Sequence, residues 1–420
     1  MKTNPLSLFP EPLALRGDFQ LGRLPKGFAE LRELLSHEPG KGSPKGDAEL
    51  IIDASWFDLT LLASFSQLIR NGSQNFQKLS LKFRSLTPRK VMFLWETGFW
   101  SHIQANRDRS PVLSTPDPWH HQPLQDNRPS NYTPILRYDI SEPSDDVRQY
   151  VLDLESHLKA TAVYPYICTT DVIDSREYLF LLLWELIHKA HRHSGGTYLS
   201  LSAQVFLGPD VETTHFAPQD SLQPLPEQLR NHLRAQFAEE RRKSVLQERS
   251  RWFRRHSAAT FLVISVVDNG CGVPSRLRSQ EKTDTVSDSS ALKAAFSPSM
   301  SDRMNDPSLF DVHGLSQVDR LVKEYDGYLY VQSGNARLQS SVTAEVAEDI
   351  ASNEVLPGTL FQILLPLRSI VGRKRALRIP SNTAEVSTQQ DESVLGVYHT
   401  LRLQHHEGKG AVFELRAGRR

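Results

Sequence analysis

Cysteine is scarce in this chain: Cys168 and Cys271 are the only two among 420 residues, and they lie far apart. This argues against a disulfide scaffold and favours a reducing compartment. No stretch approaches the ~20 consecutive apolar residues that a membrane-spanning helix needs. The N-terminal MKTNPLSLFPEP also lacks the charged-then-apolar layout of a signal peptide. These absences predict a soluble cytoplasmic protein with no membrane partner.

An excess of charge of either sign is missing too. The 49 Lys and Arg residues are balanced by 49 Asp and Glu residues. A balanced charge gives no indication of nucleic acid or an anionic membrane as a partner. The 39% of hydrophobic and 23% of charged residues are ordinary for a soluble globular protein. A chain of 420 residues can form two or three domains, each with its own core.

The chain divides into four predicted parts. These are a small α/β module at residues 1–107, a linker at 108–132, a larger α/β domain at 133–373 and a C-terminal extension at 374–420. Within the larger domain, two stretches are interpreted as insertions, at residues 208–256 and 338–356.

Strand and helix patterns alternate in the first part. The stretches at residues 49–54 (ELIIDA) and 79–83 (LSLKF) predict strands. Residues 58–72 predict a helix that ends at a glycine, and residues 85–100 predict a second amphipathic helix. The order strand–helix–strand–helix predicts a small α/β domain.

That order resembles STAS domains, the anti-anti-sigma-like protein-binding modules. The likeness lies in a strand that ends in Asp53 and a helix that opens at Asp58. STAS domains often carry a phosphorylatable serine directly after the Asp at the helix start, and this chain has Leu59 there. The resemblance therefore implies a STAS-like fold and a protein-binding role, and it does not imply phosphorylation.

The predicted linker offers a weak metal motif. His120 and His121, with Asp117 nearby, lie in a stretch rich in Pro, Asp, Asn and Ser. Adjacent histidines in such a loop are not held in ligand geometry by a regular element, and no cysteine lies close by. We favour a solvated loop and predict no metal site.

The rest of the chain is organised around residues 177–196, EYLFLLLWELIHKAHRHSGG. Apolar side chains recur there at steps of three and four, which predicts a helix with one buried face. Glu185 lies beside this stripe, where an ionisable group is costly without a partner. A surface carboxylate is the plain alternative for Glu185 taken alone.

A buried strand with an acidic end follows at residues 259–274, ATFLVISVVDNGCGVP. The β-branched run predicts a strand that ends in Asp268. Gly270 and Gly272 let the backbone turn sharply and approach a ligand closely. An Asp at this place can accept a hydrogen bond from an exocyclic amine, although an Asp-Asn-Gly stretch by itself is mostly a turn.

A third stretch begins with a glycine-entered helix. Gly314 opens an amphipathic helix, and two strands, YLYVQS and GTLFQILLPL, come after it. The free N–H groups and the dipole at a helix N-terminus favour anions, so this place can hold phosphate. The alternative is an ordinary surface helix.

In this order, the three stretches resemble the GHKL superfamily, the Bergerat-fold ATP-binding proteins that include sensor histidine kinases and anti-sigma serine kinases. The resemblance covers roughly residues 133–367. It implies an α/β-sandwich domain with ATP as its ligand, and it makes residues 177–196 the N box and residues 275–312 a mobile nucleotide lid. It implies roles for the following residues: Glu185 as general base, Asp268 as adenine contact, Gly270 and Gly272 as lid hinge, Gly314 and Leu315 as phosphate-binding glycine box, and Thr359 as support of the adenine contact.

Two positions depart from the family pattern. The N box normally has an Asn four residues after the Glu, which binds Mg²⁺, and this chain has Lys189. An ammonium group has no acceptor and cannot ligate a cation, but it can neutralise phosphate directly. This puts Mg²⁺ and hydrolysis in doubt while it favours nucleotide binding. Val312 replaces the earlier glycine of the second box, which predicts a stiffer far hinge of the lid.

Three histidines also lie on the N-box helix: His188, His191 and His193. Their spacings of three and two differ from the i, i+4 pair that zinc-binding helices use. We expect contacts on the phosphate side or plain surface exposure, and we place His193 with the nucleotide contacts.

The first insertion is basic, with nine Arg or Lys against four Glu in residues 226–256. A solvated helix face is the ordinary interpretation, and a docking surface for an acidic partner is the alternative. Two hypotheses follow for the whole chain. One is an ATP-dependent switch, with weak ATPase or serine-kinase-like activity, that acts on protein partners through the N-terminal module or the basic insertion helix. The other is an inactive GHKL scaffold. A homodimer is left open.

Overall fold

The computed structural model describes seventeen stretches of the chain. They are residues 13–35, 48–54, 56–73, 76, 79–84, 87–104, 112–113, 131–140, 147–161, 182–190, 194–210, 227–257, 259–281, 286–297, 314–366, 401–406 and 409–415.

The first part of the chain forms a four-stranded sheet with the order β1-β2-β3-β4. Every neighbouring pair in it is parallel. Its elements are β1 (Leu13–Arg16), α1 (Phe28–Leu35), β2 (Ala48–Asp53), α2 (Leu59–Ser73), β3 (Leu79–Arg84), α3 (Pro88–Glu96), α4 (Phe99–Gln104) and β4 (Val112–Leu113). Parallel strands need helical crossovers, so this arrangement agrees with the predicted alternation of strand and helix.

The second part forms a seven-stranded sheet with the order β10-β9-β8-β11-β7-β6-β5. Every neighbouring pair in it is antiparallel. Its strands are β5 (Leu136–Asp139), β6 (Tyr198–Leu207), β7 (Thr260–Asp268), β8 (Tyr328–Ser333), β9 (Ala336–Ser341), β10 (Ala344–Asp349) and β11 (Thr359–Pro366). The chain is therefore of the mixed α/β class, as predicted.

Helices accompany this sheet, and a separate hairpin lies in the C-terminal extension. The helices are α5 (Val147–Lys159), a helix at residues 182–190, α8 (Glu227–Lys243), α9 (Gln247–Arg255), α10 (Val273–Glu281), α11 (Asp288–Ala295), α13 (Gly314–Glu324) and the 3₁₀ turn η4 (Ser352–Glu354). The hairpin pairs β12 (Leu401–His406) with β13 (Lys409–Leu415). None of the helices in the described stretches has the length and apolar content that a membrane crossing requires.

The predicted helix at residues 85–100 is two helices in the structure. Gly98, with φ +71, lies between α3 and α4 in a conformation that side chains disfavour. The N–H of Gly98 donates to the carbonyl of Trp95 at 2.9 Å, which closes the end of α3. Apolar periodicity continues across such a break, so it did not reveal the turn.

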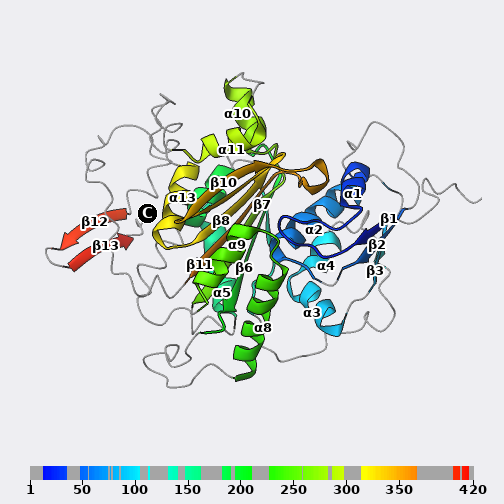
Figure 1. Ribbon diagram of the computed structural model, residues 1–420, viewed down its shortest axis with the longest axis horizontal. Helices are drawn as coiled ribbons and strands as arrows, with labels where there is room; N and C mark the ends of the chain where they lie inside the picture. The colour runs from blue at the N-terminus through cyan, green and yellow to red at the C-terminus, as the bar shows by residue number, and fades with distance from the viewer. Residues whose placement is uncertain are drawn as a thin grey trace, which may run out of the picture.

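The two faces of the seven-stranded sheet are covered differently. Side chains of β7 alternate between them, with Leu262 and Ile264 on one face and Phe261 and Val263 on the other. The first face packs against α5, α11, α13 and the helix at residues 182–190. The second face shares one hydrophobic cluster with the N-terminal sheet and its helices. Figure 1 shows this arrangement, with α2 between the two sheets.

Polar contacts also fix α2 on the second face. The hydroxyl groups of Thr60 and Ser265 lie 2.6 Å apart, and Gln67 Nε2 donates to Ser200 Oγ at 2.7 Å. Leu59, at the start of α2, is 5% exposed. The beginning of this helix is thus buried against the larger sheet.

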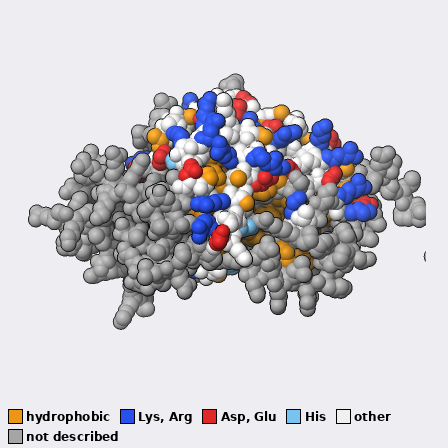
Figure 2. Space-filling model, turned by 60° about the horizontal axis from the view of Figure 1, so that its bottom comes forward, with side chains coloured by type: hydrophobic (Ala, Val, Ile, Leu, Met, Phe, Trp, Pro, Cys, Tyr) orange, Lys and Arg blue, Asp and Glu red, His pale blue; other side chains and the backbone are white. Residues whose placement is uncertain are grey.

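The basic insertion folds into α8 and α9, which pack with their apolar residues inward. Phe237, Trp252 and Phe253 join the cluster that the two sheets share. Arg241, Arg254 and several further Arg side chains are exposed on the outer side. On the described part of the face brought forward in Figure 2, Lys and Arg side chains are interspersed with acidic ones.

Candidate functional site

Three polar side chains form a row across one end of the seven-stranded sheet. Asp268, the last residue of β7, pairs with Thr359, the first residue of β11. Thr359 in turn pairs with Ser333, the last residue of β8. Because side chains two residues apart share a face, all three lie on the side covered by the helix at residues 182–190 and α13. We call these three residues the polar row.

All three members of the polar row are buried, and Asp268 has 3% of its surface exposed. Its Oδ1 accepts the N–H of Gly270 at 2.8 Å and the N–H of Thr359 at 3.3 Å. Burial raises the pKa of this carboxyl to about 7, against the opposing effect of the two backbone N–H groups. From the described residues, Oδ2 accepts no hydrogen bond.

The hydroxyl groups of the polar row are linked. Ser333 Oγ lies 3.0 Å from Thr359 Oγ1, and it accepts the backbone N–H of Val273 at 2.8 Å. Val273 is the first residue of α10. Ser333 therefore ties the start of α10 to the sheet beside Thr359. The sequence analysis did not identify Ser333, because its role depends on a strand pairing that the sequence does not show.

The turn after Asp268 lies directly against the loop that follows the helix at residues 182–190. A Cβ added to Gly270 would lie 2.2 Å from the carbonyl oxygen of Ser194, so only glycine fits there. The N–H of Cys271 donates to the same oxygen at 2.8 Å. Gly272 has φ +82, which a residue with a side chain rarely adopts. Both glycines thus permit the turn predicted for this stretch.

Asn269 fastens the same two loops with its side chain. Its Oδ1 accepts the N–H groups of Thr197 at 2.9 Å and Tyr198 at 2.8 Å. Its Nδ2 donates to Thr197 Oγ1 at 3.0 Å. The sequence analysis treated Asn269 only as part of a turn. The one signal available was that asparagine readily bonds to backbone groups.

The helix at residues 182–190 carries two of the predicted site residues. The part of its predicted apolar stripe from Leu182 on is confirmed, since Leu182, Leu186 and further apolar residues are buried on the sheet, whereas Leu179 lies outside the described residues. Glu185 is also buried, with 9% exposure, and Lys189 is half-buried. The predicted contact residue His193 lies outside the described residues.

The predicted phosphate-binding helix is α13, which begins at Gly314. Leu315 is partly buried against the helix-covered face of the sheet, and Val318 is fully buried there. Asp319 Oδ1 accepts Ser340 Oγ at 2.5 Å, and Lys323 Nζ reaches Glu345 at 2.9 Å. These contacts fix the middle of α13 on β9 and β10.

The first half of the predicted lid is helical. Residues 275–312 were expected to form a polar mobile segment, yet α10 and α11 occupy its described part. Asp288 Oδ2 accepts the N–H of Asn335 at 2.7 Å, and the N–H of Ser289 donates to Asp349 at 2.8 Å. Leu292 is fully buried between α11 and the sheet. Short polar helices of this kind carry too few apolar residues for their periodicity to be recognised.

The described side chains of the site supply hydrogen-bond donors and acceptors. In the described stretches, no group of three or more His, Cys, Asp or Glu side chains is arranged to hold a metal ion. The polar row offers instead a buried acceptor beside two hydroxyl groups, under a turn fixed by Asn269. Comparison of the chain with protein-family models, with curated proteins and with solved structures gives no match.

Proposed function

We propose that residues 133–373 form a Bergerat-type α/β sandwich that binds an adenine nucleotide at the polar row. One layer of helices on an antiparallel sheet supports this fold. The single observation that carries the proposal is the buried Asp268 beside Thr359, beneath a turn whose glycines allow close approach. The oxygen Oδ2 of Asp268 accepts nothing from the described residues, so it can receive the exocyclic amine of adenine.

The same proposal assigns the phosphates to the start of α13. The first N–H groups of a helix have no partner within the helix and attract anions, and α13 begins at Gly314. Lys189 would neutralise phosphate charge, and Glu185 would be the general base if water attacks. The Lys189 ammonium does not fit a role as Mg²⁺ ligand, so no step here depends on that ion.

A nucleotide-dependent switch is the activity that we propose, with protein partners as its targets. The beginning of α2, where STAS domains resemble this module, is buried against the larger sheet. A partner can therefore contact this end of α2 only when the module moves relative to the sheet. The alternative is an inactive scaffold of the same fold, and Lys189 is the residue that favours it.

Calorimetry with ATP, in the presence and absence of Mg²⁺, tests the proposal. A pocket with one adenine anchor and a phosphate cradle should bind with low-micromolar to millimolar affinity. Asp268→Asn should abolish binding. Asp153→Asn is the matched control. Asp153 lies on α5, outside the polar row, and accepts a hydrogen bond from the Tyr138 hydroxyl at 3.2 Å. The assignment of Asp268 as the adenine contact would be refuted if Asp268→Asn gave the same heat of ATP binding as the intact chain. It would also be refuted if the intact chain gave no heat of binding.

A further inference from the structure

The turn that follows α13, at Asp326, is contacted by side chains of α9 and of His256, which follows it. We call this turn the Asp326 corner. Asp326 follows α13 with φ +55, a left-handed conformation that is unusual for a residue other than glycine. The indole Nε1 of Trp252 donates to the carbonyl oxygen of Asp326 at 2.9 Å. His256 Nε2 lies 3.1 Å from Asp326 Oδ2. Two side chains from the end of α9 thus fix both the backbone and the carboxylate of this corner.

His256 contacts both Trp252 and Asp326 through its two ring nitrogens. Its Nδ1 lies 2.9 Å from the carbonyl oxygen of Trp252, which can only accept. Its Nε2 faces the Asp326 carboxylate, which also accepts when it is ionised. The imidazole of His256 thus bridges the Trp252 carbonyl and the Asp326 carboxylate. The ring also stacks on Trp252, with 4.4 Å between the centroids.

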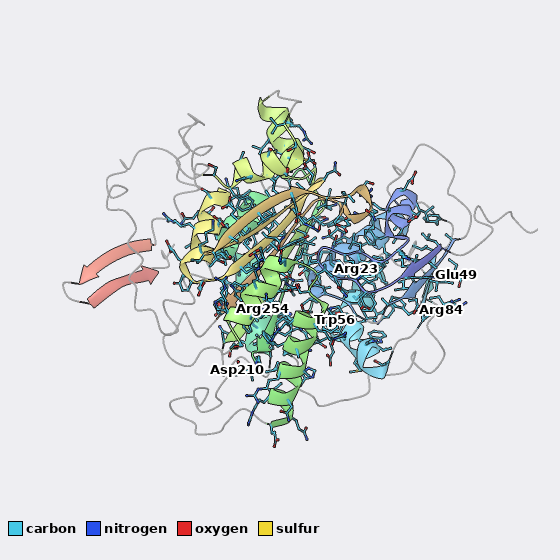
Figure 3. The ribbon with its side chains drawn as sticks, in the orientation of Figure 1. Arg23, Glu49, Trp56, Arg84, Asp210 and Arg254 are labelled. Carbon is cyan, nitrogen blue, oxygen red and sulfur yellow. The ribbon has the colours of Figure 1, made fainter. Side chains whose placement is uncertain are left out.

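The other end of α9 holds the start of α2. Arg249, which is 3% exposed, donates to Glu240 at 3.0 Å and lies 3.8 Å from Asp58 Oδ2. Asp58 accepts the N–H of Thr60 at 2.9 Å, which caps α2. Gln362 of β11 reaches Asp58 Oδ2 at 3.2 Å. Figure 3 labels Arg254 on α9 and Trp56 in the segment that leads into α2.

Two carboxyl groups share one guanidinium group in this cluster. The single guanidinium of Arg249 faces two carboxylates, those of Asp58 and Glu240. Burial raises the pKa of Glu240 to about 7. Removing one partner from a buried ionic pair is strongly destabilising, so the energy of this cluster depends on where each partner lies. The start of α2 is therefore attached by a contact that a displacement of α9 can strengthen or weaken.

We propose that α9 couples the nucleotide site to the N-terminal module, because it joins the end of α13 to the first turn of α2. The inference deepens the proposed function, since α13 is the helix assigned to the phosphates. A displacement of α13 would move Asp326, and α9 would move with it because Trp252 and His256 contact Asp326. The movement of α9 would then change the contacts of Asp58 at the start of α2. Nine helical residues span about 13 Å, so the connection is short and stiff.

Hydrogen exchange without nucleotide tests the coupling independently of ATP binding. His256→Gln and Trp252→Phe each remove a contact to Asp326, and they should speed exchange of the amides of residues 60–62 at least threefold. Arg241→Gln on the exposed side of α8 is the matched control and should leave these amides unchanged. Unaltered exchange in both variants would overturn the proposal, whatever the chain does with nucleotides.

Saturating ATP supplies the second measurement. In the intact chain, exchange at residues 60–62 should change at least threefold when ATP is added, and His256→Gln should abolish this change while ATP still binds. ATP binding without any change at these amides would also refute the coupling. Should the intact chain bind no ATP, the nucleotide assignment fails, and the measurement without nucleotide still decides the coupling.

Discussion

The backbone N–H of Thr359 donates to the side-chain Oδ1 of Asp268 at 3.3 Å, across the pairing of β11 with β7. A strand-end backbone group thus holds a buried carboxylate in place from the neighbouring strand. The N–H of Gly270 supplies the second bond to the same oxygen. One oxygen of the carboxylate is fixed by the chain, and this geometry leads to predictions about stability as well as binding.

Asp268→Asn is expected to stabilise the fold while it abolishes nucleotide binding. The folded-state pKa of about 7 lies above the ordinary 3.8, so ionisation of Asp268 opposes folding. The penalty is absent below pH 3.8, grows as pH rises, and is complete above pH 7. We expect a gain on the order of 1–2 kcal/mol in the free energy of unfolding at pH 8, and a smaller gain at pH 5. Urea unfolding at both pH values measures it. If Asp268→Asn lowers the free energy of unfolding at both pH values, the folded state favours the ionised carboxylate.

Asn269→Ala is expected to weaken the fold and the nucleotide site together. The substitution removes the acceptor for Thr197 and Tyr198, and the two backbone donors lose their partner. The cost should be about 2 kcal/mol in the free energy of unfolding. Asn269→Asp keeps the acceptor and loses only the donor to Thr197 Oγ1, so it should cost less. Equal losses in the two variants would contradict the role assigned to the side-chain oxygen.

Lys189→Asn is expected to raise Mg²⁺-dependent phosphate release from ATP. The amide oxygen can ligate the cation, whereas the ammonium group cannot. Lys189→Met is the control, because it removes the charge without supplying a ligand. Phosphate release is measured with and without Mg²⁺ in all three chains. The same rate in Lys189→Asn and in the unsubstituted chain would remove this interpretation of Lys189.

Glu240→Gln is expected to flatten the dependence of stability on pH. Burial raises the pKa of Glu240 from 4.5 to about 7, with the nearby Asp58 adding to the shift and Arg249 opposing it. Ionisation therefore opposes folding increasingly from pH 4.5 to 7. The amide still accepts from Arg249 and carries no charge, so the variant should gain on the order of 1–2 kcal/mol at pH 8 relative to pH 5. A pH profile that matches the unsubstituted chain would show that Glu240 does not titrate in this range.

Much of the fold was predictable from periodicity. The strand at Phe261–Val267, the amphipathic helix from Gly314 and the apolar stripe around Leu186 are all present. Each depends on a local pattern that one buried face imposes on the sequence. The polar row was predictable only in part: Asp268 and Thr359 were identified, whereas Ser333 was not.

Contacts between segments that are distant in the chain could not be predicted from the sequence. Nearly every residue of α2 is buried, but its sequence does not show that the larger sheet covers it through Thr60 and Ser265. Asn269 bonds to Thr197 and Tyr198, which lie about seventy positions earlier in the chain. Such contacts follow from strand order, and hydrophobic periodicity carries no information on strand order.

The hydrophobic cluster between the two sheets has a consequence for how the protein can be divided. Phe65 of α2 and Phe261 of β7 belong to this one cluster. Separating the N-terminal part from the larger sheet would therefore expose hydrophobic side chains on both. Cutting the backbone once between residues 113 and 131 should leave the two pieces associated and co-eluting on a sizing column. Producing either piece by itself should instead yield material that aggregates.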